Sequence, residues 1–304
     1  MQPVFAVIVP VAFVLALGVF LRARVLKSPE PWMGLEFTTY YVFTPALFMV
    51  SIGNADLSAV PLGPLAAAIA VPVLLVAGAA VVLSRALGFP GPAVAAMMQG
   101  SIRLNTYIGL AFAQAVYQVQ GVAVFALACA VMVPLVNVLC VAAHSAWGSS
   151  PGTKHQPMWR ELATNPLIVG CIAGVLLNVA PWRSEPLDAV LTMLGAPALA
   201  CGTLAAGAAI TLKVTRGDLA ALPLVGVLKF AAMPAAAFGM GTWLGLPPTA
   251  LFAVVLICSL PVAASSVILS SRLGGDVRLM ASLNGFQTVA SIATLPVTLW
   301  LTGV

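Results

Sequence analysis

The sequence predicts an all-α integral membrane protein with ten transmembrane helices, and three observations lead to this prediction. Hydrophobic residues make up 62% of the 304 residues, whereas charged residues make up only 7%. Ten apolar stretches approach the length of about 20 residues that a helix needs to cross a hydrocarbon core of about 30 Å. Ten of the 13 Lys and Arg residues fall in alternate connections between these stretches. A soluble domain of this size carries far more surface charge, so a soluble fold is excluded.

Short connections rich in Gly, Pro and charged residues separate the ten predicted spans. The spans cover residues 4–22, 34–53, 62–84, 93–117, 121–146, 165–181, 187–211, 219–242, 248–271 and 279–301. The longest polar stretch, residues 148–164, divides the chain into five-helix repeats at 1–147 and 165–304. Because five is odd, the second repeat enters the membrane from the opposite side, which is typical of transporters built from inverted repeats.

The distribution of positive charge predicts how the chain is oriented. The connections after spans 1, 3, 5, 7 and 9 contain Arg22, Arg24, Lys27, Arg85, Lys154, Arg160, Lys213, Arg216, Arg272 and Arg278. The remaining connections and the C-terminus contain only Arg183. Cytoplasmic loops retain an excess of Lys and Arg. We therefore expect a cytoplasmic 148–164 linker and both termini on the outer side of a cell inner (plasma) membrane. Because no basic segment precedes the first apolar run, we also expect the first span to remain uncleaved.

The composition also indicates which kinds of partner to exclude. The net charge is +5, but the basic residues cluster only at Arg22, Arg24 and Lys27. Such a small cluster is typical of a cytoplasmic loop of a membrane protein and not of a surface that binds nucleic acid. The five cysteines form no C-x-x-C pair, and the chain has two histidines, so no zinc or iron–sulfur spacing can be assembled. We expect no nucleic acid, no metal and no cofactor.

Arg103 is the most costly residue to place in a membrane, because it lies near the middle of the fourth span. A central arginine costs about 2.5–3.5 kcal/mol on insertion scales. No Asp or Glu is expected at similar depth, since the nearest acids, Glu36 and Asp56, fall at the ends of predicted spans. Arg103 is therefore expected to bind backbone carbonyls of a broken helix, to contact an anionic ligand, or to extend its guanidinium group to the interface. Asn105 and Thr106 add an amide and a hydroxyl group, so all three are candidate substrate-binding residues.

The ninth span, at the matching position of the second repeat, contains Pro261 followed by Ser265 and Ser266. A proline inside a span removes a backbone donor and kinks or unwinds the helix. Interrupted helices at matching positions of two repeats mark substrate sites, and their N-terminal ends favour an anion. We predict that these three residues belong to the substrate site, with a simple packing kink as the alternative.

Four further polar residues are candidates for coupling or gating. Lys229, near the middle of the eighth span, could titrate, form a pair, take the place of a coupling cation, or extend its ammonium group to the interface. Gln287, Thr288 and Ser291 form a polar stripe on the tenth span, which indicates either interhelical hydrogen bonding or a functional role. A G-x-x-x-G pattern at 170–174 predicts close helix packing in the sixth span.

Several segments, in order along nearly the whole chain, resemble the auxin efflux carrier family. Residues 103–109 resemble its R-x-N-x-x-x-G segment, and residues 41–48, 165–168 and 287–296 resemble its second span, the start of its second half and its last span. That family includes bacterial malonate and malate permeases and is similar to plant PIN carriers.

The resemblance implies a ten-helix inverted-repeat fold in which the fourth and ninth helices are unwound and cross. It also implies secondary transport of organic acid anions, with Asn105 facing the substrate carboxylate and Pro261 at the second crossover. The sequence departs from the family in one respect: many relatives have an asparagine after this proline, whereas this chain has Ser265 and Ser266.

We therefore predict a secondary transporter, not an enzyme, that moves a small organic acid by alternating access. A sodium-coupled symporter of larger, bile-acid-type anions is the first alternative. An intramembrane lipid-modifying enzyme is a remote alternative, because such chemistry uses clustered acids or histidines within the membrane and the sequence predicts none. A channel is also disfavoured, because the sequence contains no recognisable selectivity-filter segment. The sequence leaves open which acid is carried, whether a proton or sodium is coupled, and whether the chain forms a homodimer.

Overall fold

The computed structural model describes residues 2–58, 60–149, 164–180, 184–211 and 215–303, and no strand occurs within these ranges. The first half contains α1 (Gln2–Arg24), α2 (Glu30–Thr38), η1 (Thr39–Phe43), α3 (Thr44–Gly53), α4 (Leu62–Ala86), α5 (Gly91–Ile102) and α6 (Thr106–Trp147). The second half contains α8 (Pro166–Val179), α9 (Glu185–Gly195), α10 (Ala198–Ala208), η2 (Arg216–Asp218), α11 (Ala221–Val227), η3 (Leu228–Ala232), α12 (Met233–Trp243), α13 (Pro248–Ser259), α14 (Ser265–Leu273) and α15 (Val277–Thr302). Each of the ten predicted ranges contains helix.

The chain is a multi-pass membrane protein. Within the described ranges, five helical segments are long and apolar enough to cross a bilayer: Glu30–Gly53, Leu62–Ala86, Gly91–Trp147, Glu185–Ala208 and Ala221–Trp243. Large apolar side chains such as Phe13, Leu75 and Trp243 lie exposed on the outer surface, as expected of a surface that contacts lipid. The ten-span count and the inverted repeat remain predictions.

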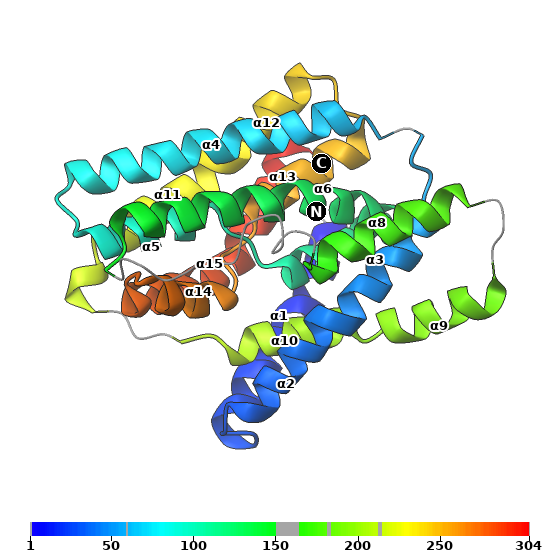
Figure 1. Cartoon of the computed structure of the whole chain (residues 1–304), viewed down its shortest axis with the longest axis horizontal. Helices are drawn as coiled ribbons and strands as arrows, with labels where there is room; N and C mark the ends of the chain where they lie inside the picture. Colours follow the sequence, from blue (N-terminus) through cyan, green and yellow to red (C-terminus); the bar gives the residue numbers. More distant parts are fainter. Residues whose placement is uncertain (1, 59, 150–163, 181–183, 212–214, 304) are drawn as a thin grey trace.

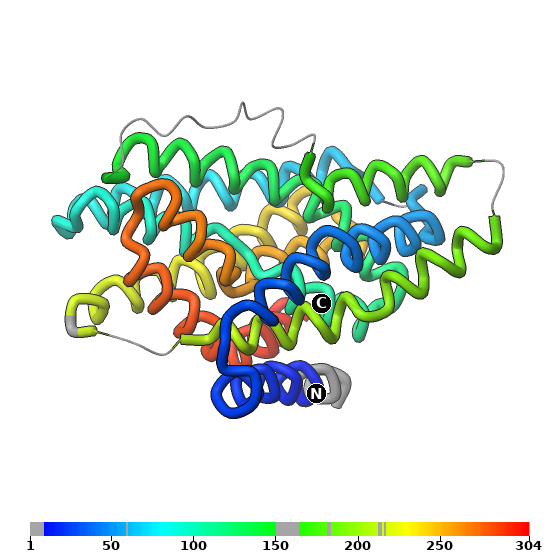
Figure 2. The backbone as a smooth tube through the Cα atoms, turned by 60° about the horizontal axis from the view of Figure 1, so that its bottom comes forward, coloured from blue at the N-terminus to red at the C-terminus, as the bar shows by residue number. Residues whose placement is uncertain are grey.

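The helices pack in two groups (Figure 1). The first group contains α1, α2, α3, α8, α9 and α10, and Figure 2 shows α1 at the edge of the molecule. The second group contains α4, α5 and α11 to α15, and α6 contacts both groups. Each group takes helices from both sides of the 148–164 linker, most of which lies outside the described residues. The packing groups are therefore not the two predicted sequence repeats.

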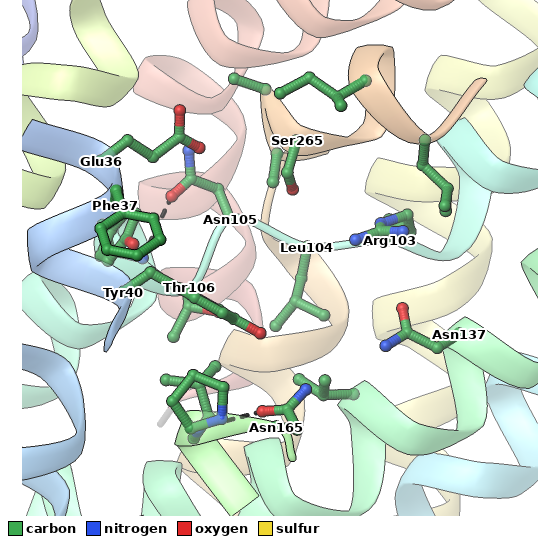
Figure 3. A pocket seen from close by; sticks show the side chains of 18 of the residues that line it. Glu36, Phe37, Tyr40, Arg103, Leu104, Asn105, Thr106, Asn137, Asn165 and Ser265 are labelled. Atoms are coloured by element: carbon green, nitrogen blue, oxygen red, sulfur yellow. Dashed lines mark hydrogen bonds between the residues drawn. The ribbon is translucent and has the colours of Figure 1, made fainter. Parts of the chain in front are cut away.

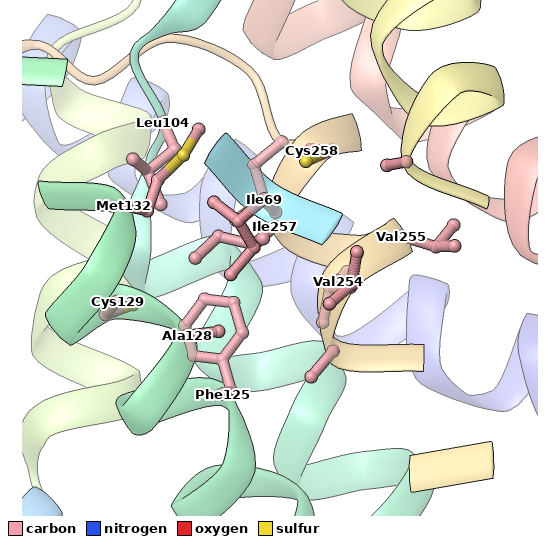
Figure 4. Packing of buried hydrophobic residues seen from close by; sticks show 14 of the residues in the cluster. Ile69, Leu104, Phe125, Ala128, Cys129, Met132, Val254, Val255, Ile257 and Cys258 are labelled. Atoms are coloured by element: carbon pink, nitrogen blue, oxygen red, sulfur yellow. The ribbon is translucent and has the colours of Figure 1, made fainter. Parts of the chain in front are cut away.

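An apolar core holds the second group together. Ile69 of α4, Phe125 of α6, and Val254 and Ile257 of α13 are all fully buried and lie close together (Figure 4). Two of these helices come from the first half of the chain and one from the second. The core thus fixes the two interrupted regions of the chain against the same scaffold.

The helices of the predicted fourth and ninth spans are both interrupted. After α5, Arg103 and Asn105 have extended backbone conformations before α6 begins at Thr106. After α13, Leu260 is extended, and Pro261 lies in the non-helical stretch before α14. The predicted interruptions are therefore present.

The predicted loop between the fourth and fifth spans is reduced to a sharp kink at Gln118. This residue has φ of 50°, in the left-handed region, and separates two helical segments of α6. A Cβ atom added at Gly121 would collide with the carbonyl oxygen of Ala113, so a glycine is needed where the two segments approach. The chain therefore changes direction without a polar loop.

Helices α3 and α8, from opposite halves of the chain, are joined along a close seam. A Cβ atom at Gly170 would lie 2.9 Å from Pro45 Cα, and one at Gly174 would lie 2.9 Å from Ile52 Cβ. The Asn178 side-chain nitrogen lies 2.8, 3.0 and 3.2 Å from three backbone carbonyl oxygens at and just after the end of α3. The prediction of close packing at the G-x-x-x-G pattern is confirmed.

Candidate functional site

A cavity of about 530 Å³ lies between the two helix groups, against the interruption that follows α5 (Figure 3). One wall comes from α2, η1, α10 and the start of α8, and the other from α6, α14 and the non-helical residues before them. Its polar and charged lining residues include Glu36, Tyr40, Arg103, Asn105, Thr106, Asn137, Thr164, Asn165, Ser265 and Arg272. The cavity thus combines residues from both halves of the chain.

Three helices begin at this cavity. Asn105 and Asn165 cap α6 and α8 in the same way: their Oδ1 atoms accept hydrogen bonds from the backbone N–H groups of Tyr107, at 3.1 Å, and Leu167, at 3.0 Å. Helix α14 begins at Ser265, which also lines the cavity. Helix N-termini carry partial positive charge, so three of them directed at one cavity favour a bound anion.

Arg103 adds a full positive charge to the same cavity. Its backbone N–H caps α5 by donating to Gln99 at 3.0 Å, and its side chain is partly exposed. The guanidinium interacts with the Cys140 thiol, and no described carboxylate lies within ion-pair distance of it. Arg103 is therefore a cation in the cavity that can meet an anionic ligand, as is Arg272 of α14.

Glu36 also lines the cavity, contrary to the expectation that it falls at the end of a span. Helix α2 continues through η1 into α3, so residues 30–53 form one helical run with Glu36 inside it. The side chain is partly buried, and Figure 3 shows it near the amide end of Asn105. A carboxyl group therefore shares the cavity with Arg103, which the expected position of Glu36 at the end of a span did not indicate.

Gln287 bridges the two interrupted regions. Its Oε1 accepts from the backbone N–H of Val262 at 2.8 Å, and its Nε2 donates to the carbonyl oxygen of Gly100 at 2.9 Å. Both backbone groups are released from helical bonding by the interruptions. Interhelical hydrogen bonding is therefore confirmed for Gln287. Thr288 and Ser291, by contrast, donate to carbonyl oxygens of their own helix, at 2.8 and 2.7 Å.

Lys229 is fully buried on η3, behind the interruption after α5. Its Nζ lies 3.5 Å from the carbonyl oxygen of Ile102, the last residue of α5. The interpretation that its side chain extends to the membrane interface was wrong. Lys229 and Gln287 therefore both bind carbonyl groups freed where α5 ends.

Of the predicted substrate-binding residues, the structure brings Arg103, Asn105, Thr106 and Ser265 to the cavity. Pro261 and Ser266 do not line it; Ser266 is fully buried and lies behind the cavity wall. The predicted coupling and gating residues, Lys229, Gln287, Thr288 and Ser291, also lie away from it.

Sequence reasoning missed Glu36, Asn137 and Asn165 as lining residues. Asn137 is an isolated amide in an otherwise apolar span, which was a usable signal. Asn165 directly precedes Pro166, an order typical of a helix start. Glu36 gave no such signal, because its position depends on where the helical run begins.

Comparison with known proteins gives one family match. Residues 209–303 match the model of the Sodium Bile acid symporter family, in the part of the chain that includes α13, α14 and α15. No curated protein matches the chain. This C-terminal part is thus similar to a family of membrane symporters, and the resemblance to auxin efflux carriers stays a prediction.

Proposed function

We propose that the protein is a secondary transporter that moves a small organic acid anion across the membrane by alternating access. The observation that carries the proposal is the meeting of three helix N-termini and the Arg103 guanidinium in one cavity between two helix groups. This arrangement attracts negative charge without a metal ion. The similarity of the C-terminal part to a symporter family supports transport over enzymatic chemistry.

The position of the cavity supports a movement of one helix group past the other. The first group supplies Glu36 and Tyr40, and the second supplies Arg103 and Ser265. A ligand held between the groups becomes accessible from the other side when they shift. Arg272 and Thr164 flank connections that the charge pattern predicts to be cytoplasmic, which supports the proposal that the cavity faces inward.

A sodium-coupled symporter of larger anions is the second candidate, favoured by the name of the matching family. A cavity of about 530 Å³ is large enough for a drug-sized ligand, so its size is compatible with either class of substrate. Uptake of a short carboxylate and of a bile acid, each with sodium and with choline as the cation, separates the two candidates.

The proposal is tested by ligand-induced thermal stabilisation of the purified protein with mono- and dicarboxylates, followed by uptake into proteoliposomes. Arg103→Ala is expected to remove both stabilisation and uptake while the protein remains folded and inserted. Arg85→Ala is the matched control, because Arg85 is an exposed residue in the last turn of α4, away from the cavity. Unchanged uptake by Arg103→Ala would exclude Arg103 from the site.

A further inference from the structure

Lys229 occupies an unusual position for an ammonium group. The residue is fully buried, and its Nζ lies 3.5 Å from the Ile102 carbonyl oxygen and 3.8 Å from the Met233 sulfur. Both contacts are hydrogen-bond acceptors. A buried ammonium group needs such partners, since it has lost its water.

No carboxylate compensates this ammonium group from the helices around it. The η3 segment packs against α4, α5, α11, α12, α13 and α15, and none of these helices contains Asp or Glu. Their other titratable or charged residues are Cys258, which interacts with Lys229, and Arg85 and Arg278 at the ends of α4 and α15. The negative charge that Lys229 meets must therefore come from the backbone.

The interrupted helices supply that negative charge. Helix α5 ends at Ile102, which contacts Lys229, and α13 ends at Ser259, next to Cys258. The C-terminal end of a helix carries partial negative charge. The N-terminal ends of α6 and α14 face the cavity instead. The two interruptions thus present positive ends to the anion cavity and negative ends to the region behind it.

In transporters with broken helices, the freed carbonyls and helix C-termini commonly coordinate the coupling cation. We propose that the Lys229 ammonium group is a resident cation that occupies this place, so that transport through the Arg103 cavity requires no sodium. The inference rests on the proposed transport function and specifies how its coupling differs from that of a sodium symporter.

The experiment uses two variants and one added amine. Lys229→Ala removes the charge and leaves a space next to the Ile102 carbonyl, whereas Lys229→Met removes the charge and keeps the space filled. Uptake and thermal unfolding are measured in choline buffer, with and without methylammonium. The wild-type protein with methylammonium is the control, because the amine also dissipates pH gradients.

Wild-type uptake is expected to be equal in sodium and choline buffers. Lys229→Ala is expected to lose uptake and unfold at a lower temperature, and methylammonium is expected to restore both properties, partly or fully. Lys229→Met is expected to lose uptake without such restoration. The inference would be overturned if uptake by the wild type depended on sodium, or if Lys229→Met took up substrate at the wild-type rate.

Two readouts keep this test separate from the proposed function. If no carboxylate enters or stabilises the wild-type protein, the proposed function fails, while the unfolding temperature of Lys229→Ala with methylammonium still tests the resident cation. If carboxylates are transported but their transport requires sodium, only the inference of a resident cation fails, and the proposed function stands. If neither variant can be purified, the sodium dependence of the wild type decides.

Discussion

The side-chain Nε2 of Gln99 donates a hydrogen bond to the carbonyl oxygen of Ser266 at 2.8 Å, although the two residues are 167 positions apart in the sequence. The Oε1 of the same side chain accepts from the Ser270 hydroxyl at 3.2 Å. The last turns of α5 are thereby bound to α14, close to where both helical paths are interrupted. The two interruptions form one structural unit, and changes in one are expected to reach the other.

The first prediction concerns Gln287, which bonds to both interrupted regions. Gln287→Leu leaves the backbone N–H of Val262 and the carbonyl of Gly100 without these partners in a buried setting. Each unsatisfied buried group costs about 1–3 kcal/mol. We expect a clear decrease in the unfolding temperature of the purified protein in detergent.

The control for this prediction is Ser291→Ala. Ser291 is also buried, but its hydroxyl donates only to the Thr288 carbonyl oxygen in the same helix. We expect a smaller decrease in stability for this variant. Equal decreases for the two variants would show that Gln287 does not bridge the interruptions.

The second prediction separates helix capping from ligand binding at Asn105. Asn105→Ala removes both the cap of α6 and an amide group in the cavity. We expect a stability loss of about 1 kcal/mol together with a higher half-saturating substrate concentration. Asp276→Ala removes a comparable cap, at the start of α15, from a residue outside the cavity lining. That variant should lose stability without any change in affinity, and a parallel change in affinity would argue for a purely structural Asn105.

The third prediction concerns Glu36, whose carboxyl group shares the cavity with Arg103. An ionised carboxylate there repels an anionic substrate and competes for the positive charge. Glu36→Gln keeps the size of the side chain and removes its charge, so we expect a lower half-saturating substrate concentration at neutral pH. Weaker binding by this variant would instead indicate that Glu36 contributes to binding directly.

The fourth prediction is a pH dependence of stability that arises outside the cavity. Burial acts to raise the pKa of the Asp218 carboxyl, but hydrogen bonds from Thr215, Arg278 and Ser282 outweigh it and hold this pKa below its ordinary value. The Arg278 guanidinium lies 2.6 Å from the carboxylate. A lowered folded-state pKa means that ionised Asp218 stabilises the folded protein above its ordinary pKa of about 4.

This stabilisation is lost as the pH falls through the lowered pKa. The unfolding temperature of Asp218→Asn should therefore lie below that of the wild type at pH 7, and the difference should shrink as the pH decreases toward 3. Thermal unfolding followed across this range provides the measurement. A difference that does not change with pH would show that the charge of Asp218 is not involved.

Much of the architecture could be predicted from the sequence, because membrane helices are recognised by their length and apolar composition. The interruptions were also predictable, since Pro261 cannot donate to a helix and Arg103 is too costly to leave in a continuous apolar span. The glycines at 170 and 174 predicted close helix packing, because only small residues let helices approach so closely, but they did not indicate that α3 is the partner.

The details of the site were harder to predict, because they depend on which side of an interruption a side chain faces. Ser265 and Ser266 are neighbours in the sequence, yet the first lines the cavity and the second is buried behind it. Gln287 and Ser291 share a helix face, but only Gln287 is long enough to reach freed backbone groups on other segments. The helical spacing of polar residues shows that they share one face of a helix, but it does not show which groups lie opposite that face.

The seam between α3 and α8 limits how the molecule can change shape. Its glycines leave no space for sliding, and the Asn178 amide fastens the end of one helix to the other. In the proposed transport cycle these two helices are therefore expected to move as one rigid unit, although they belong to opposite halves of the chain. If transport follows the proposed cycle, a covalent tether between α3 and α8 leaves it intact, whereas the same tether between the α2 and α14 walls of the cavity stops it.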